Sequence, residues 1–413
     1  MKAAVTIARI IVGLLFIFSG LIKANDPHGL EYKMYEFFET WGWHQNYSDV
    51  ANFKNIAYVI GVLQVWMAQH TLLLSILMNA FEIIAGFALL LGWRIKLFSW
   101  LLLLLILFFT FLTGYTYVTG KPTNCGCFGD CIPISSKTSF GKDVVLTILI
   151  GFIFWQRRKI RSLFPEKIAA LAMLGIIIFS FGIQWYTLTY LPVIDCLPFR
   201  KNKNINEQMK VPANAVYPVT TITFVYEKNG QRKEYTANNL PADLDSTYKL
   251  IKRFDKVIVE GKNYQPPIHG FVLSGITDED STQVVLSQPY AVLLFSQDFS
   301  APVSKWKDDF EKLYAETKRK NIPVYAVTAQ LDEAKKYFAA TAFKDIPVFK
   351  CDITAIRTAA RTNPCIYLLN QGSVVDKQSY KRIDKILSEV KSLSAQPVAP
   401  IENNSPKPDT SKP

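Results

Sequence analysis

The sequence of 413 residues has few cysteines and few histidines, six and four respectively. Six cysteines are too few for a disulfide-stapled scaffold in a chain of this length, and they are unevenly spaced. The net charge of +12 would suggest nucleic acid as a partner of a soluble protein, but no basic-aromatic motif of that kind is present. Instead, basic residues cluster at the ends of apolar runs and in the C-terminal half. We therefore expect no nucleic-acid partner.

Hydrophobic residues make up 50% of the chain and are concentrated in its first part. Apolar runs of about 17 to 25 residues can cross a bilayer as helices. Five runs qualify, at about 3–22, 72–91, 95–117, 144–154 with extensions at both ends, and 168–190. The first run is long for a signal peptide and no small-x-small cleavage pattern follows it, so we interpret it as a retained helix. The sequence predicts a multi-pass membrane protein in contact with the lipid bilayer.

Lysine and arginine near the ends of these runs predict their orientation, because cytoplasmic loops are enriched in both residues. The connections 93–96 and 156–161 are basic and are expected to be cytoplasmic. The segment 25–70 is acidic and is expected outside, where its apolar part, 53–69, would form a helix at the membrane interface. We therefore predict an inner (cytoplasmic) membrane protein with a cytoplasmic N-terminus, whose chain after residue 190 is extracytoplasmic.

Three cysteines, Cys125, Cys127 and Cys131, lie close together between the third and fourth runs. In an oxidising compartment such thiols can exchange disulfides with a partner, or they can close a structural disulfide. Cys196, just past the fifth run, is a candidate fourth member of the group. Structural zinc sites usually have four ligands in C-x₂₋₄-C spacing, so no metal is predicted. The sequence leaves redox chemistry and a structural disulfide open.

Glu82 lies near the middle of the second run. A carboxylate at that depth costs about 2.5 to 3.5 kcal/mol on insertion scales, so Glu82 is expected to be protonated, paired or facing a polar cavity. A functional role is the default interpretation of such an intramembrane polar residue, but structural pairing explains it nearly as well. Lys142 and Asp143 are expected at the outer start of the fourth run, where charge costs little.

Several motifs in the first part of the chain resemble a known membrane family. The segment 8–27 resembles the opening of DoxX-like proteins, and the stretch 82–92, from Glu82 to a glycine, resembles their second helix. The CGCFG motif at 125–129 and FGKDVVL at 140–146 resemble the MauE branch, named for methylamine utilisation. The resemblance covers about residues 5–156 and implies a four-helix membrane bundle. The MauE branch is associated with maturation of a disulfide-rich periplasmic enzyme, which favours a thiol role, whereas nothing else in the chain indicates methylamine.

The composition changes after the fifth run, where apolar runs stop. Two strands are predicted at 220–226 and 232–236, around an Asn-Gly turn. From residue 266 the sequence predicts two strands followed by alternating helices and strands and a final hairpin. The best-defined elements are a buried strand at 290–296, a helix at 305–320, a strand at 323–328, a helix at 331–340 and the hairpin at 363–375.

This order resembles a thioredoxin-like domain of the peroxiredoxin or TlpA type. Pro364 falls where that family carries a cis-proline beside its active site. The family's CxxC belongs directly after the strand that ends at Ser296, but the segment 297–304 contains no cysteine. Without a thiolate there is no nucleophile, so this domain is not expected to work as a thioredoxin. Cys351 and Cys365 are expected to be buried apolar fillers.

The predicted fold class is an all-α membrane bundle, a four-helix DoxX/MauE-like core plus a fifth helix, followed by a soluble α/β thioredoxin-like domain. We expect the DoxX/MauE-like bundle at 1–160, the fifth transmembrane helix and its exit at 161–195, a small β-rich connector at 196–265, the thioredoxin-like domain without CxxC at 266–394, and a disordered tail at 395–413.

The first functional hypothesis is an extracytoplasmic thiol–disulfide role, in electron transfer or maturation of envelope proteins, through the cysteine loop. A quinone or another carrier would have to accept electrons within the bundle, but the sequence shows no quinone site, so the cofactor is unknown. The alternative is a non-catalytic, membrane-anchored assembly protein that presents its thioredoxin-like domain to an envelope partner. A transporter using Glu82 is a weaker hypothesis, because five spans without a visible repeat argue against it. The sequence does not decide whether the chain is an enzyme.

Overall fold

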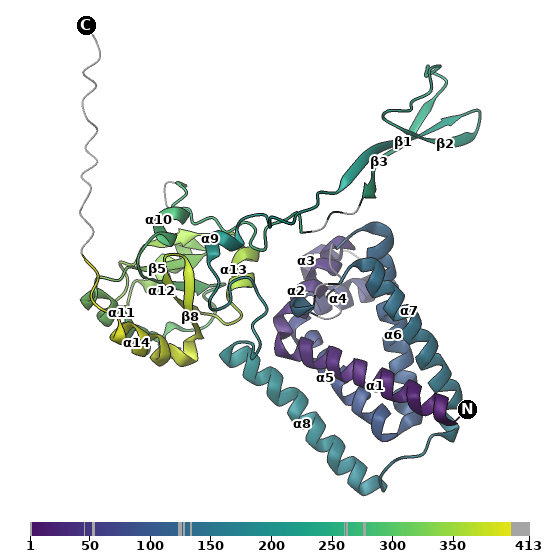
Figure 1. Ribbon diagram of the computed structural model, residues 1–413, viewed down its shortest axis with the longest axis horizontal. Coiled ribbons are helices and arrows are strands. Elements are labelled where there is room, and N and C mark those ends of the chain that lie inside the picture. Colours follow the sequence, from purple (N-terminus) through teal and green to yellow (C-terminus); the bar gives the residue numbers. More distant parts are fainter. Residues whose placement is uncertain are drawn as a thin grey trace.

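The computed structural model describes residues 2–44, 46–51, 54–122, 126, 129–132, 134–259, 261, 263–275 and 278–397. They form a group of long helices, a three-stranded sheet that projects away from it, and an α/β domain (Figure 1). Of the predicted disordered tail, residues 398–413 lie outside the described residues.

Within the described residues, five helices are long and apolar enough to cross a membrane. They are α1 (Lys2–Asn25), α5 (Thr71–Leu91), α6 (Ile95–Thr119), α7 (Ser136–Gln156) and α8 (Glu166–Tyr190). Each contains one of the five predicted runs. Three shorter helices, α2 (Pro27–Thr40), α3 (Tyr47–Val50) and α4 (Asn55–Gln69), connect α1 to α5. The apolar helix α4 has 15 residues, fewer than the roughly 20 that a span needs.

Glycines allow α1 and α5 to pack closely. A Cβ atom at Gly86 would lie 2.8 Å from the carbonyl oxygen of Gly13, and one at Gly20 would lie 3.0 Å from the backbone nitrogen of Ile83. Small residues of this kind let two membrane helices approach backbone to backbone. The buried core of the bundle includes Val12, Phe16, Leu89, Leu102, Ile106, Leu146 and Ile150 from α1, α5, α6 and α7.

The fifth spanning helix, α8, binds α1 and α5 through polar side chains near its C-terminal end. Gln184 donates to the carbonyl of Ile76 at 3.2 Å and accepts a hydrogen bond from Asn79 at 3.2 Å. Thr187 donates to the carbonyl of Ala24 at 3.1 Å. In an apolar surrounding such hydrogen bonds stabilise helix association.

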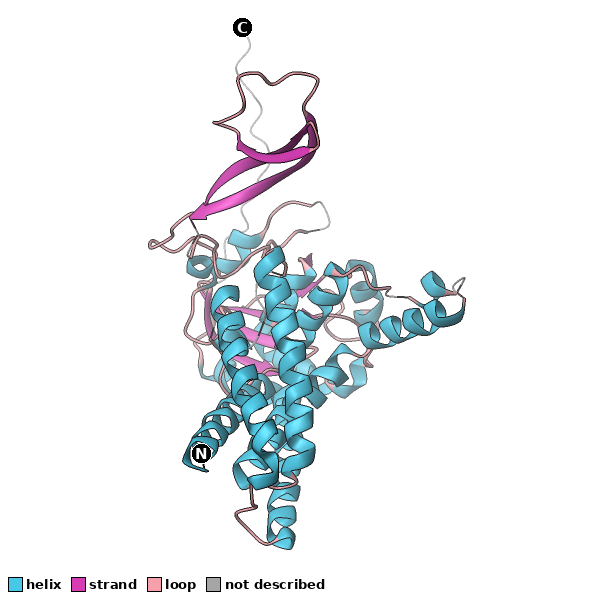
Figure 2. Ribbon diagram, turned by 90° about the vertical axis from the view of Figure 1, so that its right-hand side faces the viewer, coloured by secondary structure: helices cyan, strands magenta, loops and turns pink. Residues whose placement is uncertain are grey.

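The projecting sheet has the order β2-β1-β3 and is antiparallel. Its strands are β1 (Val219–Lys228), β2 (Gln231–Thr236) and β3 (Lys249–Val259). The predicted hairpin turn at Asn229 and Gly230 has positive φ at both residues, 54° and 77°, as a type I′ turn requires. The strand β3 was not predicted. Figure 2 shows the sheet standing away from the helices.

The α/β domain contains a five-stranded sheet of order β6-β5-β4-β7-β8. Its strands are β4 (Ala291–Ser296), β5 (Val324–Thr328), β6 (Val348–Lys350), β7 (Cys365–Asn370) and β8 (Ser373–Ser379). The strands β4, β5 and β6 run parallel, and β7 is antiparallel to both β4 and β8. This order and polarity are those of a thioredoxin-like fold, so the predicted fold class is confirmed.

Helices cover both faces of this sheet. One apolar core lies under α11 (Lys307–Arg319), α12 (Leu331–Phe338) and α14 (Ile383–Ser392). The other lies under α9 (Ile205–Gln208), α10 (Thr282–Leu286) and α13 (Ile353–Ala359). The second of the two strands predicted from residue 266 is β4, but the first is wrong, because the described residues between 266 and Ala291 form isolated bridges at Ser274 and the short helix α10.

Candidate functional site

Two of the four candidate redox cysteines, Cys131 and Cys196, are joined by a disulfide across 65 residues of sequence. Cys131 ends the short helix η1 (Gly129–Cys131), in the loop between α6 and α7. Cys196 lies six positions after the end of α8 at Tyr190. The disulfide fixes this loop to the exit of α8, so both lie on the same side of the bilayer. Cys125 and Cys127 lie outside the described residues.

Arg361 of the thioredoxin-like domain reaches the same place. Its Nε donates to Asp26 at 2.9 Å, and its Nη2 donates to Asp130 at 3.1 Å. Asp26 directly precedes α2, and Asp130 directly precedes the disulfide-bonded Cys131. The Arg361 side chain is only 3% exposed. Burial acts to lower the pKa of Arg361, but Asp26, Tyr32 and Asp130 together raise it above its usual value. Arg361 therefore remains charged and connects the loop, the bundle and the α/β domain.

Tyr32 of α2 completes this contact. The guanidinium groups of Arg361 and Arg357 lie 5.2 Å and 5.3 Å from its ring centroid, within cation–π range. The Tyr32 hydroxyl donates to Gln297 at 3.4 Å. Burial raises the pKa of Tyr32 to about 12. Gln297 follows β4, where a thioredoxin would carry its CxxC, so this face of the domain is turned toward the bundle.

The proline singled out in the sequence borders the same face. The Asn363–Pro364 peptide bond is cis. The Asn363 side chain accepts hydrogen bonds from the Ser296 hydroxyl and from the backbone N–H of Gln297, both at 3.0 Å. Pro364 thus follows a residue that binds the end of β4, while its proposed place beside an active site stays a prediction.

A second set of contacts holds the exit of α8 to strand β8. The Lys377 ammonium lies 2.8 Å from Asp195, which is next to Cys196. Ser379 donates to the carbonyl of Thr189 at 2.6 Å. Arg382 donates to the Tyr186 hydroxyl at 3.1 Å. The thioredoxin-like domain is therefore attached to the helices at two separate places.

Glu82 forms a buried ion pair with Lys23, which joins α5 to α1. The two side chains are 1% and 3% exposed. Pairing was one of the three states expected of Glu82. The Lys23 ammonium also lies 5.1 Å from the ring centroid of Phe109. Its charge is therefore contacted both by a carboxylate and by an aromatic face.

The expected position of Lys142 and Asp143 is wrong. Helix α7 begins at Ser136, where the Ser135 side chain accepts from the backbone N–H of Thr138, so both residues lie beyond the first helical turn. Asp143 is 1% exposed and accepts a hydrogen bond from Thr113 at 3.1 Å. Lys142 lies 2.7 Å from the same carboxylate. The polar residues 136–143 concealed the start of this helix from a search for apolar runs.

The two cysteines of the α/β domain, Cys351 and Cys365, are free and buried, which confirms the expectation. Burial raises the pKa of each thiol to about 12. Neither forms the thiolate that disulfide exchange needs at neutral pH.

Sequence reasoning identified the cysteines but missed Asp26, Tyr32, Asp130 and Arg361. The signal that could have found Asp130 is its position beside Cys131. No local pattern marks Arg361, which lies 231 positions from Asp130 in sequence.

Comparison with known proteins supports the assignment of the bundle. Residues 1–156 match the family described as "Methylamine utilisation protein MauE". These residues form a MauE family domain. The MauE domain contains helices α1 to α7 and includes Glu82, Asp130 and Cys131. Its match confirms the predicted MauE resemblance, while the broader DoxX-like resemblance stays a prediction.

The remaining comparisons concern the chain after the MauE domain. Residues 220–260, which contain β2, β3 and all of β1 except Val219, match a "Domain of unknown function (DUF8463)". No curated protein matches the chain. A solved structure of the Xanthomonas campestris bacterioferritin comigratory protein, described by its alkyl peroxide reduction activity, is 17% identical with a TM-score of 0.23, and the match covers 29% of this chain and 89% of that one.

Proposed function

We propose that the chain is an extracytoplasmic thiol–disulfide protein of the cytoplasmic membrane, acting in electron transfer or in maturation of envelope proteins. The observation that carries this proposal is the disulfide between Cys131 and Cys196. It uses two of the four candidate cysteines and leaves Cys125 and Cys127 as the pair for exchange. Disulfides persist mainly in oxidising compartments. Together with the basic connections at the opposite ends of the spans, this supports an extracytoplasmic cysteine loop.

The exchange itself needs only this pair in its disulfide form and a client protein with two thiols. A thiolate of the client attacks the disulfide between Cys125 and Cys127 and forms a mixed disulfide. The second client thiolate then attacks that bond and leaves both loop cysteines reduced. The client loses two electrons and gains a disulfide, and the loop takes up the two electrons.

The thioredoxin-like domain has a non-catalytic part in this proposal. It has no cysteine in 297–304, and its own thiols, Cys351 and Cys365, are buried. Its arginine Arg361 instead binds Asp130, the neighbour of Cys131. The domain would therefore position the cysteine loop rather than exchange electrons.

A second candidate function is a non-catalytic, membrane-anchored assembly protein. The missing CxxC and the two buried thiols favour it. In that case the disulfide between Cys131 and Cys196 is structural, and Cys125 and Cys127 have no exchange role. The face of the domain near Gln297 already contacts Tyr32 of the bundle, so an envelope partner would have to bind elsewhere on it.

Trapping thiols in whole cells distinguishes the two functions. Cells are quenched in acid, and free thiols are labelled with a polyethylene glycol maleimide under denaturing conditions, before and after reduction. The proposal predicts that Cys131 and Cys196 stay oxidised, while Cys125 and Cys127 shift between thiol and disulfide when cells are exposed to a reductant or an oxidant. A Cys131→Ser/Cys196→Ser variant leaves Cys125 and Cys127 as the only loop cysteines whose state the label reports. A loop pair that never changes state would favour the assembly function.

A further inference from the structure

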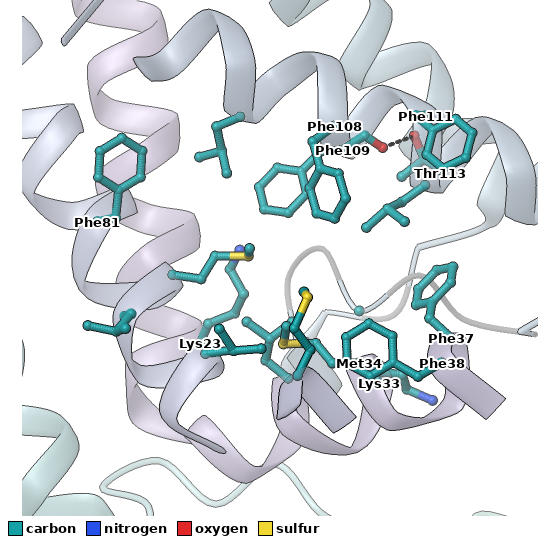
Figure 3. Close-up of a pocket in the computed structure, with 18 of the residues that line it drawn as sticks. Lys23, Lys33, Met34, Phe37, Phe38, Phe81, Phe108, Phe109, Phe111 and Thr113 are labelled. Atoms are coloured by element: carbon teal, nitrogen blue, oxygen red, sulfur yellow. Dashed lines mark hydrogen bonds between the residues drawn. The ribbon is translucent and has the colours of Figure 1, made fainter. Parts of the chain in front are cut away.

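A cavity of about 590 Å³ lies among α1, α2, α5 and α6. Its size is that of a small-molecule site. Figure 3 shows Phe37 and Phe38 on one side of the open space and Phe108 and Phe109 on the other. Gly126, which lies between Cys125 and Cys127 in the sequence, also lines it. The cavity thus combines an aromatic interior within the membrane helices with direct proximity to the cysteine loop.

Three lysines belong to the described residues that line this cavity, and the ammonium group of each has an acidic partner. The pairs are Lys23 with Glu82, Lys33 with Glu36 at 2.9 Å, and Lys142 with Asp143 at 2.7 Å. Because each of these positive charges is compensated, an anionic head group would meet no uncompensated cation among the described lining residues. An ammonium group in an ion pair still has further N–H bonds to donate. The polar groups therefore suit a neutral ligand that accepts hydrogen bonds.

Glu82 provides a second, independent observation. It lines a smaller cavity of about 20 Å³ that shares Ser19, Phe109 and Lys142 with the large one. The Glu82 side chain is 1% exposed, and its Oε2 has no hydrogen-bond partner among the described residues. Buried polar atoms normally have such a partner. This oxygen, beside the large cavity, can accept a hydrogen bond only from a ligand group that carries a donor, such as the hydroxyl of a reduced quinone.

We propose that the large cavity binds a quinone. A quinone is neutral, its planar ring can stack on the aromatic lining, and its two carbonyl oxygens can accept hydrogen bonds from lysine. Its apolar chain suits a cavity among membrane helices. A lipid acyl chain would make no use of the lysines, so it matches the lining less well.

The assignment rests on the proposed function, in which the loop cysteines must pass on the electrons that they receive. Two thiols lose two electrons and two protons as they form a disulfide bond. The quinone takes up both electrons and both protons and becomes a quinol. No further oxidant is needed for this step.

Photolabelling tests the site directly. The full chain in nanodiscs is irradiated with an azido-ubiquinone that carries a ten-carbon chain, and labelled peptides are identified by mass spectrometry. We expect label on cavity-lining segments of α2 and α6, displaced by excess decylubiquinone but not by dodecanol. Absence of specific label, or equal displacement by dodecanol, would overturn the quinone assignment, and the second result would identify an acyl-chain site.

A matched pair of variants on α6 tests whether the ligand binds in this cavity. Leu105 lines the cavity, whereas its neighbour Leu104 is 55% exposed on the same helix and lies outside the lining. Leu105→Trp should fill the cavity and lower the labelling at least tenfold, and Leu104→Trp should leave it unchanged. Formation of the disulfide between Cys131 and Cys196 reports that each variant is folded. Equal labelling of the two variants would overturn the proposed location.

A cysteine variant separates this inference from the proposed function. Cys125→Ser/Cys127→Ser removes the exchange pair but leaves the cavity, so it should be labelled like the wild-type chain. If the wild-type chain is labelled but its thiols never change state, the proposed function fails and the quinone site stands as a binding site. If the thiols exchange but no label is bound, the quinone inference alone fails.

Discussion

Arg361 is the single residue with the largest expected effect on how the thioredoxin-like domain is held. Removing one partner of a buried ion pair costs about 3 to 5 kcal/mol. Because the Asp130 side chain is 44% exposed, we expect Arg361→Ala to lower the free energy of unfolding by about 3 kcal/mol, at the lower end of that range. Thermal unfolding in detergent measures the effect, as does the rate at which trypsin cleaves at lysines and arginines in the chain beyond residue 190.

The control for this variant is Arg357→Ala. Arg357 also stacks on Tyr32, so its removal tests the loss of the ring contact. We expect a cost of about 1 kcal/mol or less, as for an exposed cation–π pair. Equal effects of the two variants would contradict the role assigned to the ion pairs with Asp26 and Asp130.

The buried pair of Lys23 and Glu82 predicts a strongly non-additive double variant. Glu82→Leu leaves the Lys23 ammonium buried without its carboxylate, which should cost about 3 to 5 kcal/mol. Lys23→Met/Glu82→Leu removes both charges, and apolar replacements of buried pairs are often near neutral in stability. The unfolding midpoints of the two single variants and the double variant in detergent measure this. A double variant as unstable as the sum of the single ones would show that the two residues do not act as a pair.

The buried thiols of Cys351 and Cys365 predict a loss of stability at alkaline pH. Each has a folded-state pKa of about 12, above the value of about 8.5 for an exposed thiol. Below pH of about 8.5 both states keep their protons, and as the pH rises from there toward 12 the unfolded chain ionises first, so stability falls. Urea unfolding at several pH values should show a shallower fall for Cys351→Ala/Cys365→Ala than for the wild type. Parallel pH curves would contradict this.

At the scale of elements, the contact between α1 and α5 depends on glycine. A methyl group at Gly86 would lie 2.8 Å from a backbone oxygen of α1, so Gly86→Ala should force the helices apart and cost about 1 to 3 kcal/mol. The matched control is Gly151→Ala on α7, where an added Cβ meets nothing within 4 Å. There the better helix propensity of alanine should leave stability unchanged or raise it by up to about 1 kcal/mol. Unfolding midpoints that change alike would refute this account of the packing.

Hydropathy located the spanning helices because contact with lipid imposes a local compositional rule on each of them. It failed where a helix extends into a polar sequence, as at the start of α7, where Ser135 caps a turn that contains no apolar run. The strand β3 was missed for a related reason. Its sequence, KLIKRFDKVIV, lacks a regular alternation of apolar and polar residues, since most of the sheet is exposed and buries no continuous face.

At the scale of the whole molecule, the sequence identifies the candidate cysteines but does not predict which residues surround them in the fold. The fold class followed from apolar runs and from the order of strands and helices. By contrast, Arg361 lies 335 positions from Asp26 and 231 from Asp130, and ion pairs at such separations leave no pattern in a single sequence. The cavity beside Gly126 likewise depends on how several helices are arranged. Both features arise from tertiary packing.

The most direct test of the thiol–disulfide proposal is to trap a client protein. In Cys127→Ser the Cys125 thiolate can still attack the disulfide of an oxidised client, which is the reverse of the exchange, but no second loop thiol is left to release the reduced client. A mixed disulfide with the client should therefore persist and appear on a non-reducing gel as an adduct that dithiothreitol removes. Cys125→Ser/Cys127→Ser is the control and should form no such adduct. The proposal predicts an adduct with an envelope protein for the single variant and loss of function for the double variant. No adduct, together with full function of the double variant in cells, would contradict it.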